Sequence, residues 1–420
     1  MHMYDVVVIG AGAAGLTAAQ QLLRANVQNI VVLEAQQYVG GRIRTYHDWG
    51  RPIELGAEFI HGSNTVTAQM ARELHMETIA AHEDRKLVDA QGTALSHQQR
   101  QQYHALLEYV SHHGQQGVPI ADVIAKNPVA TDPTIRQLVA LTIADYEAGD
   151  ADKLDSGAFT DMERYAAHDG GTLLLRDGYQ RIVQHLMQDV PIRLQSVVRF
   201  VDYTDAGKVL VHLEDGETIT AQQVAVTVSL GVLQHGRILF MPALPEEKQA
   251  AIVSLGMGNA IKVLVRFKDP HDVASLFHYA DGENESLQTI SCWWASASDP
   301  RVLVGYAGGS RAAAALALPE QRLYQKVVAD LSAVFGSSLA DNIIDYKIVR
   351  WDTNPYSYGA YSNHPVGTSL HDRKALAAPV DGRLFWAGEA TMADASYATV
   401  HGAIASGYRA ADEVLAAYGG

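Results

Sequence analysis

The segment YDVVVIGAGAAGLTAAQQLLRA, residues 4–25, constrains the fold more than any other part of the chain. The apolar, β-branched run Val6–Ile9 predicts a strand buried on both faces. Gly10, Gly12 and Gly15 follow in the spacing G-x-G-x-x-G, and a helical pattern comes next. In this motif the first glycine allows a tight turn, the second admits a pyrophosphate, and the third lets the helix pack on the strand. Free N–H groups at the helix start favour phosphate.

A second apolar segment, NIVVLEA, predicts the next strand and ends near Glu34. This acidic residue comes about 20 residues after Gly15, where a carboxylate binds the ribose hydroxyls of an adenosine. A carboxylate at this place disfavours a 2′-phosphate. The two strands therefore predict a site for an adenosine dinucleotide.

The stretch YVGGRIRT, residues 38–45, supplies Gly40, Gly41 and two arginines. A second glycine pair with a guanidinium suits a larger dinucleotide whose pyrophosphate needs neutralising. We expect Arg42 to contact the cofactor, whereas Arg44 has an equally good structural interpretation.

Composition limits the remaining classes. A chain of 420 residues fits two domains, and no window is apolar and long enough to span a membrane. The formal net charge of −15 argues against a nucleic-acid surface and could favour a cationic ligand, although acidic proteins are common. The single cysteine, Cys292, suits a reducing compartment, and the start of the chain lacks the pattern of a secretory leader. We expect a cytoplasmic protein without a metal site.

In this order, the motifs GAGAAGL, LEA, GGRIRT and ELGAEFIHG resemble the flavin-containing amine oxidase family, especially its polyamine and spermine oxidases and lysine-specific demethylases. The segments LFWAGEAT and ATVHGAIASG near residue 400 extend the resemblance over nearly the whole chain. The resemblance implies FAD. It implies cofactor contacts at Gly10, Gly12, Ala14, Gly15, Glu34, Ala35, Gly41, Arg42, Gly56, Ala57, Glu58, Val198, Trp351, Gly388, Glu389, Thr399, Val400 and Ala403.

The implied fold class is α/β, with a Rossmann-like FAD-binding domain and a discontinuous α+β substrate domain that has a mixed or antiparallel sheet. The FAD-binding domain is expected at residues 1–80, 172–252 and 362–420, and the substrate domain at 81–171 and 253–361. Helical spacing between residues 97 and 148 predicts a helical insertion in the substrate domain.

Lys262 stands inside an apolar strand pattern, NAIKVLVRF. Strand alternation alone favours a solvent-facing lysine. In the resembled family a lysine in this context is bridged through water to the flavin, which favours a catalytic lysine here.

Tyr361 matches the tyrosine that forms one wall of the family's aromatic cage, where an electron-rich ring orients the amine. Ala360 stands where monoamine oxidases have a cysteine bound covalently to the flavin, so we expect noncovalent FAD. Thr399 replaces the second cage aromatic, which suggests a wider pocket and a longer substrate.

Two further residues have more than one interpretation. His61 is either structural or an acceptor near the substrate amine. Glu58 could bind a substrate ammonium or support the pyrophosphate loop with equal plausibility. We therefore include His61, Glu58, Tyr361 and Thr399 as substrate-binding residues, and Lys262, Tyr361 and His61 as catalytic ones.

In the segment LFWAGEAT, Gly388 is expected to allow close approach of the ligand, and Glu389 to accept hydrogen bonds from the ribityl hydroxyls. Thr399 and Val400 would begin a helix whose dipole faces the flavin, and Ala403 would keep this helix slim.

The predicted function is FAD-dependent oxidation of a polyamine or another long amine to an imine, which is hydrolysed to an aldehyde and an amine while dioxygen becomes hydrogen peroxide. The expected partners are the amine and dioxygen, with no nucleic acid or membrane, and a homodimer is possible. The alternatives are an L-amino acid oxidase, an amine dehydrogenase, a histone demethylase and a non-catalytic flavin-binding protein. An arginine to grip a substrate carboxylate is not obvious, which favours amines.

Overall fold

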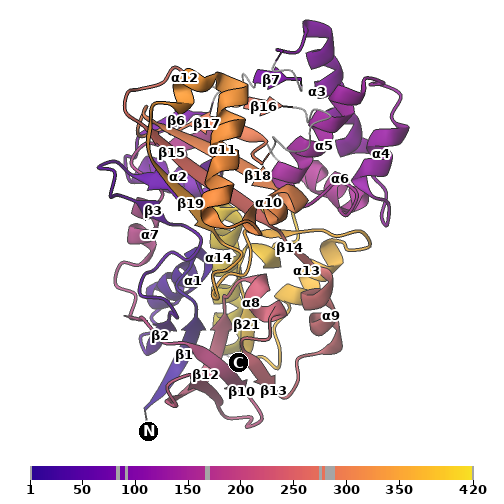
Figure 1. Ribbon diagram of the computed structural model, residues 1–420. Coiled ribbons are helices and arrows are strands. Elements are labelled where there is room, and N and C mark those ends of the chain that lie inside the picture. Colours follow the sequence, from indigo (N-terminus) through magenta and orange to yellow (C-terminus); the bar gives the residue numbers. More distant parts are fainter. Residues whose placement is uncertain are drawn as a thin grey trace.

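A computed structural model describes residues 2–81, 86–89, 93–165, 171–273, 277–279 and 289–418 (Figure 1). Its largest sheet has eight strands in the order β13-β10-β11-β12-β1-β2-β9, and β21 also pairs with β12. These strands are β1 (Met3–Ile9), β2 (Ile30–Leu33), β9 (Ile192–Arg193), β10 (Val198–Asp202), β11 (Val209–Leu213), β12 (Thr218–Val226), β13 (Leu239–Met241) and β21 (Leu384–Trp386).

The centre of this sheet is parallel, since β1 runs parallel to β2 and β12, and β12 to β21. Side chains of β1 alternate between two cores, with Val6 and Val8 on one face and Val7 and Ile9 on the other. Both faces are covered, which explains the continuous apolar run. The predicted Rossmann-like α/β fold is confirmed.

Helices α1 (Ala13–Arg24) and α14 (Val400–Tyr418) pack together on the Val6 face, with α7 (Gln180–Leu186) and α2 (Val66–Glu73) beside them (Figure 1). The other face carries α8 (Leu230–Gln234), α9 (Glu246–Ser254) and α13 (Leu370–Ala377). The first and the last helix of the described chain, α1 and α14, therefore pack together on one face of this sheet.

A second sheet of six strands lies at the opposite end of the molecule (Figure 1). Its order is β19 (Ile343–Arg350), β15 (Ala260–Phe267), β18 (Val302–Gly308), β17 (Cys292–Ala295), β16 (Phe277–Tyr279) and β7 (Lys86–Val88). The first five strands pair antiparallel. The sequence also predicts a strand in the segment SLQTISCWWAS, whose residues 286–288 lie outside the described residues.

One face of this sheet is covered by α10 (Gly309–Leu316) and α11 (Glu320–Phe335), against Ile261, Val263 and Val265. The helix α12 (Ser337–Ala340) follows α11. The opposite face carries Leu264 and, by alternation, Lys262. Lys262 is only 6% exposed, so the solvent-facing interpretation of this lysine is wrong.

The predicted helical insertion is confirmed as α3 (His97–His113), α4 (Ile120–Lys126) and α5 (Pro133–Glu147), and α6 (Ser156–Tyr165) follows beyond its predicted end. Ser96 and Gln99 form a capping box at the start of α3, and Asp132 caps α5 ahead of Pro133. Helix α5 packs on β18, which brings the last turn of α5 to the second sheet.

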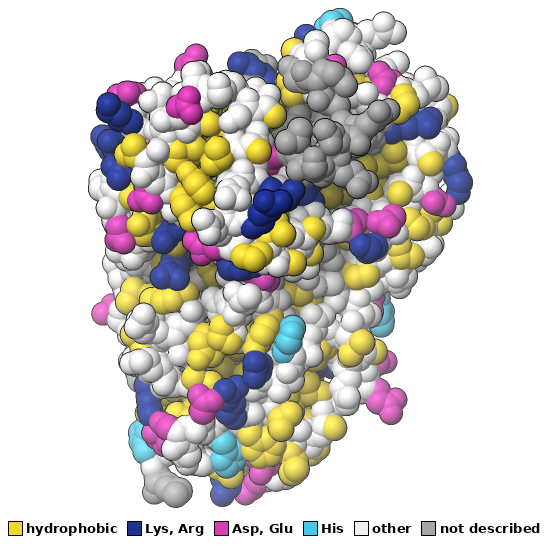
Figure 2. All heavy atoms as spheres, in the orientation of Figure 1, with side chains coloured by type: hydrophobic (Ala, Val, Ile, Leu, Met, Phe, Trp, Pro, Cys, Tyr) yellow, Lys and Arg dark blue, Asp and Glu magenta, His cyan; other side chains and the backbone are white. Residues whose placement is uncertain are grey.

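Small sheets join the two parts. They are β3 (Thr45–Tyr46) with β4 (Ile53–Glu54), β5 (Phe59–His61) with β8 (Thr172–Leu175) and β6 (Thr78–Ala80), and β14 (Gly256–Met257) with β20 (Ser362–Asn363). Figure 2 shows basic and acidic side chains intermingled over one face of the molecule. None of the described helices has the length and hydropathy needed to cross a membrane.

Candidate active site

A cavity of about 1070 Å³ is lined by residues of both large sheets and of α5. It extends from Gly10 and Glu34 on the first sheet to Lys262 and Tyr306 on the second. Every residue predicted to bind cofactor or substrate lines this cavity except Gly15 and Gly388.

The glycine turn at one end of the cavity has the geometry that a pyrophosphate requires. A Cβ atom added at Gly12 would meet no atom within 4 Å, so the space beside this backbone is open. A Cβ atom at Gly15 would lie 2.0 Å from the carbonyl oxygen of Gly10, so Gly15 serves the packing of α1 on β1. Gly40 continues the cradle, because its N–H donates to the carbonyl of Ala11 at 2.8 Å.

Glu34 is held in place at the end of β2. Its Oε2 accepts a hydrogen bond from the N–H of Ala11 at 2.8 Å, and its Oε1 accepts one from Gln36 at 2.9 Å. Burial raises the pKa of Glu34 despite these donors. Ala35 and Val198 line the same end of the cavity, which therefore fits an adenosine.

Glu389 is buried at the start of the short 3-10 helix η1 (Glu389–Thr391), which follows β21. Its Oε1 accepts from the Arg42 guanidinium at 2.8 Å, and its Oε2 accepts from the Ser362 hydroxyl at 2.6 Å and the Ala398 N–H at 3.0 Å. Burial opposes its ionisation, but the positive charges of Arg42 and Arg373 outweigh burial and lower the pKa of Glu389. Gly388 precedes it with φ of +134°, which favours glycine.

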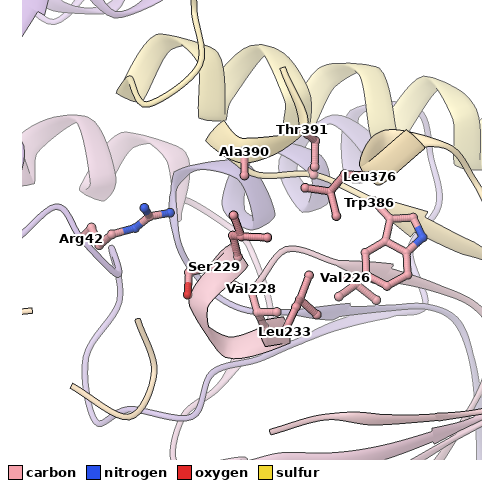
Figure 3. A pocket seen from close by; sticks show the side chains of 11 residues that line it. Arg42, Val226, Val228, Ser229, Leu233, Leu376, Trp386, Ala390 and Thr391 are labelled. Carbon is pink, nitrogen blue, oxygen red and sulfur yellow. The ribbon is translucent and has the colours of Figure 1, made fainter. Parts of the chain in front are cut away.

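A small cavity of about 10 Å³, roughly the space of one water, lies beside this ion pair. Figure 3 shows the Arg42 guanidinium directed toward Val228 and Ser229, with Trp386 and Leu376 on the far side. Ser229 caps α8 and donates to the Ser357 carbonyl at 2.7 Å, so the serine at this position secures a turn.

Lys262 donates three hydrogen bonds. Its Nζ lies 2.6 Å from Oε2 of Glu58 and 3.1 Å from each of the carbonyl oxygens of Glu54 and Gly56. The other carboxylate oxygen of Glu58 accepts from Nε1 of Trp294 at 3.1 Å. Lys262, Glu58 and Trp294 are all buried.

Beside this group, the Glu54 carboxylate accepts hydrogen bonds from the N–H of Tyr179 and the hydroxyl of Thr45. Burial, reinforced by the negative charge of Glu58, raises the pKa of Glu54 to about 8. Glu54 is therefore mostly uncharged at pH 7.

Two tyrosines form an aromatic wall on the second sheet's side of the cavity. The hydroxyls of Tyr361 and Tyr306 are 2.7 Å apart, and the Tyr361 hydroxyl donates to the Asp145 carbonyl at 3.0 Å. Burial is the main cause that raises the pKa of Tyr361 well above its ordinary value, so it stays a neutral phenol. Trp294 packs near Tyr306 with ring centroids 6.0 Å apart.

Thr399 caps α14: its hydroxyl donates to the Ser396 carbonyl and accepts from the Gly402 N–H at 3.0 Å. Val400 and Ala403, in the first turn of α14, line the cavity, so the helix start faces it. His61 lines the cavity from β5, where its ring stacks on Phe59 at 6.1 Å. The roles assigned to Thr399 and His61 from the sequence stay predictions.

Sequence reasoning missed several lining residues, namely Asp145, Tyr146 and Glu147 of α5, Trp294, Tyr306, Asp394 and Tyr397. The apolar segment RVLVGYAGG has the pattern of a strand, and its single tyrosine, Tyr306, was the available signal. Cys292 lines the cavity from β17. Ala360 also lines it, and its carbonyl accepts a hydrogen bond from Arg42. Within the described ranges, no group of three metal-ligating side chains occurs.

The glycine turn with Glu34, the buried carboxylates and the aromatic wall line one cavity, which fits an adenosine dinucleotide and leaves room beside Tyr361 and Tyr306. A family model of flavin-containing amine oxidoreductases matches residues 13–140 and 143–415. The chain belongs to this family, and FAD is its cofactor.

The relatives divide into two groups. Human lysine-specific histone demethylase 2 is 28% identical over 99% of this chain and 54% of its own length. Polyamine oxidase 4 of Oryza sativa subsp. japonica is 30% identical over 97% of this chain and 88% of its own. The chain thus spans about half the length of the demethylase. A solved structure of putrescine oxidase bound to putrescine has a TM-score of 0.84 at 20% identity, covers 99% of each chain and has the same fold.

Proposed function

We propose that the protein oxidises a polyamine or another long amine, with dioxygen as the electron acceptor. The CH–NH unit of the amine loses two electrons and two protons and becomes an imine. Dioxygen takes up these electrons and protons and becomes hydrogen peroxide. Water then hydrolyses the imine to an aldehyde and a smaller amine. Bound FAD supplies the two-electron acceptor for this chemistry.

The observation that carries the proposal is the pairing of an aromatic wall with carboxylates in one cavity. Tyr361 and Tyr306 present electron-rich rings, which attract a cationic or developing positive centre. Glu147 and Asp394 line the same cavity and suit a second ammonium group along a long substrate. The Tyr361 ring is fixed by its two hydroxyl contacts, so it can orient the amine without moving.

An amino acid oxidase would need an arginine for the substrate carboxylate. Three of the arginines that line the cavity are engaged: Arg42 by Glu389, Arg199 by Glu214, and Arg237 by the Tyr358 hydroxyl. This supports an amine over an amino acid. The likeness to histone demethylases makes oxidation of a methyl-lysine peptide the second candidate.

A substrate panel with peroxide detection on the FAD-loaded protein tests these functions. Spermine, spermidine and putrescine are compared with leucine, phenylalanine and a dimethyl-lysine peptide. The proposal requires peroxide with at least one polyamine at a higher kcat/KM than with any amino acid. Because the amine must be deprotonated, kcat/KM should rise with pH through the pKa of the amine. A lack of flavin bleaching by every amine under anaerobic conditions contradicts the proposal and supports a non-catalytic flavoprotein.

A further inference from the structure

In the group formed by Lys262, Glu58 and Trp294, the positive charge of Lys262 is paired with the negative charge of Glu58. The proposed function does not require this ion pair. A lysine ammonium has three donors and no acceptor. All three protons of Lys262 have partners in the chain: Glu58 at 2.6 Å and the carbonyls of Glu54 and Gly56 at 3.1 Å. Lys262 must give up one of these partners before it can donate to a water or a ligand.

Glu58 also has little remaining freedom. Trp294 holds its second oxygen at 3.1 Å, and the side chains of Glu58 and Lys262 are 8% and 7% exposed. The pair is therefore fixed in geometry and excluded from bulk water. Charge interactions are stronger in this buried environment than in water.

The neighbouring carboxylate does not share this role. Glu54 receives its hydrogen bonds from Tyr179 and Thr45, and burial raises its pKa to about 8. Lys262 donates to the backbone carbonyl of Glu54 but to the carboxylate of Glu58, so its ion-pair partner is Glu58 and not Glu54.

We propose that Glu58 is a positioning residue that holds Lys262 against the Glu54–Gly56 backbone and cancels its charge, so that the cavity stabilises a negatively charged cofactor ring less than Lys262 alone would. This inference concerns the cofactor face of the cavity and rests on the proposed function only in its use of the FAD-loaded protein.

The test measures sulfite binding and the midpoint potential of the FAD-loaded protein at pH 7. Sulfite donates a sulfur lone pair to the oxidised flavin, forming one bond, and the ring takes up the negative charge. In Glu58→Gln the uncompensated Lys262 charge should tighten sulfite binding about tenfold. The two-electron midpoint potential should rise by about 30 mV for a tenfold change.

Two control variants separate charge from structure. Glu58→Asp keeps the carboxylate and should restore sulfite binding to within about threefold of the parent protein. Glu54→Gln replaces a buried carboxyl that makes no ion pair with Lys262 and whose pKa burial raises, and it should change sulfite binding less than about twofold. A purely structural role for Glu58 would lower the stability of Glu58→Gln without changing the sulfite constant or the potential.

Lys262→Met provides an independent route if Glu58→Gln does not retain FAD. Removing the cation leaves the Glu58 charge, so sulfite should bind more weakly than to the parent protein. The proposal is overturned if sulfite binding and potential stay at the parent values in Glu58→Gln, or if Lys262→Met tightens sulfite binding. None of these measurements uses an amine, so a protein that failed to oxidise any amine would contradict the proposed function alone.

Discussion

Arg42 and Glu389 are separated by 347 positions in the chain, yet Nη1 of Arg42 lies 2.8 Å from Oε1 of Glu389. Glu389 is buried and Arg42 is one-quarter exposed at its side chain. The pair joins the segment after β2 to the segment after β21 at the cavity wall and holds the Glu389 carboxylate in place.

Loss of Arg42 should destabilise the protein, because it leaves the Glu389 carboxylate buried with one cation fewer. We expect Arg42→Met to lower the free energy of unfolding by about 3 kcal/mol at pH 7. Urea denaturation of the FAD-free protein measures this change. The double variant Arg42→Met with Glu389→Gln removes the unpaired charge and should recover part of the loss; no recovery would contradict the charge argument.

The same carboxylate gives a pH dependence with a definite sign. Because the folded-state pKa of Glu389 lies below its ordinary value of 4.5, its ionisation stabilises the fold at pH values above 4.5. This contribution is lost as the pH falls through the folded-state pKa. Glu389→Gln should therefore lose less stability than the parent protein between pH 5 and pH 3, as measured by thermal denaturation in matched buffers.

Gly12 and Gly15 should respond to the same substitution in opposite ways. Gly12→Ala places a methyl group in open space, so stability should change by less than about 1 kcal/mol. FAD affinity should fall, because the methyl group occupies the approach of the pyrophosphate. Gly15→Ala should cost about 3 kcal/mol, because its Cβ would lie 2.0 Å from the Gly10 carbonyl. Urea melts and FAD titration of both variants decide this, and equal stability of the two would refute the assignment.

Glu54 should make the protein less stable as the pH rises. Its pKa of about 8 in the folded protein exceeds the ordinary value of 4.5, so the folded state holds the proton longer. Stability should decline between pH 4.5 and pH 8, by at most about 5 kcal/mol from this group. Glu54→Gln imitates the protonated form and should flatten this decline; a slope identical to that of the parent protein would show that Glu54 titrates normally.

Tyr361 should matter more for stability than Tyr306, although their hydroxyls touch. Since the Tyr361 hydroxyl donates to the Asp145 carbonyl, Tyr306 donates to Tyr361. Tyr306→Phe removes one hydrogen bond and should cost about 1 kcal/mol, whereas Tyr361→Phe removes two and should cost about 2 kcal/mol. The order of the two urea midpoints checks this, and the reverse order would contradict the donor assignment.

The sequence was most informative where the backbone itself makes the site. Gly10, Gly12 and Gly15 are required by a turn, an open approach and a close packing contact, and each requirement follows from short-range geometry. Glu34 could be placed because it ends the second apolar segment about 20 residues after Gly15. Continuous apolar runs likewise predicted β1 and β2 of the first sheet, and helical spacing predicted the insertion between residues 97 and 148.

The partners of these residues could not be predicted, because they come from distant segments. Nothing near Lys262 in the chain indicates that Glu58 would accept a hydrogen bond from it, and the pattern of the Lys262 strand does not tell which face is buried. Asp145 and Glu147 read as the end of an ordinary helix until α5 is packed on β18. The pairing of Tyr306 with Tyr361 depends on the same packing.

The cofactor site cannot be complete before Glu389 and α14 have been synthesised. Glu34 and Arg42 leave the ribosome early, but their cavity stays open until Glu389 arrives and α14 packs against α1. Nascent chains arrested before residue 389 should therefore be unable to retain FAD. Flavin capture would mark the completion of this domain, and the cell's quality-control machinery would meet the chain in its cofactor-free form until Glu389 and α14 have been made.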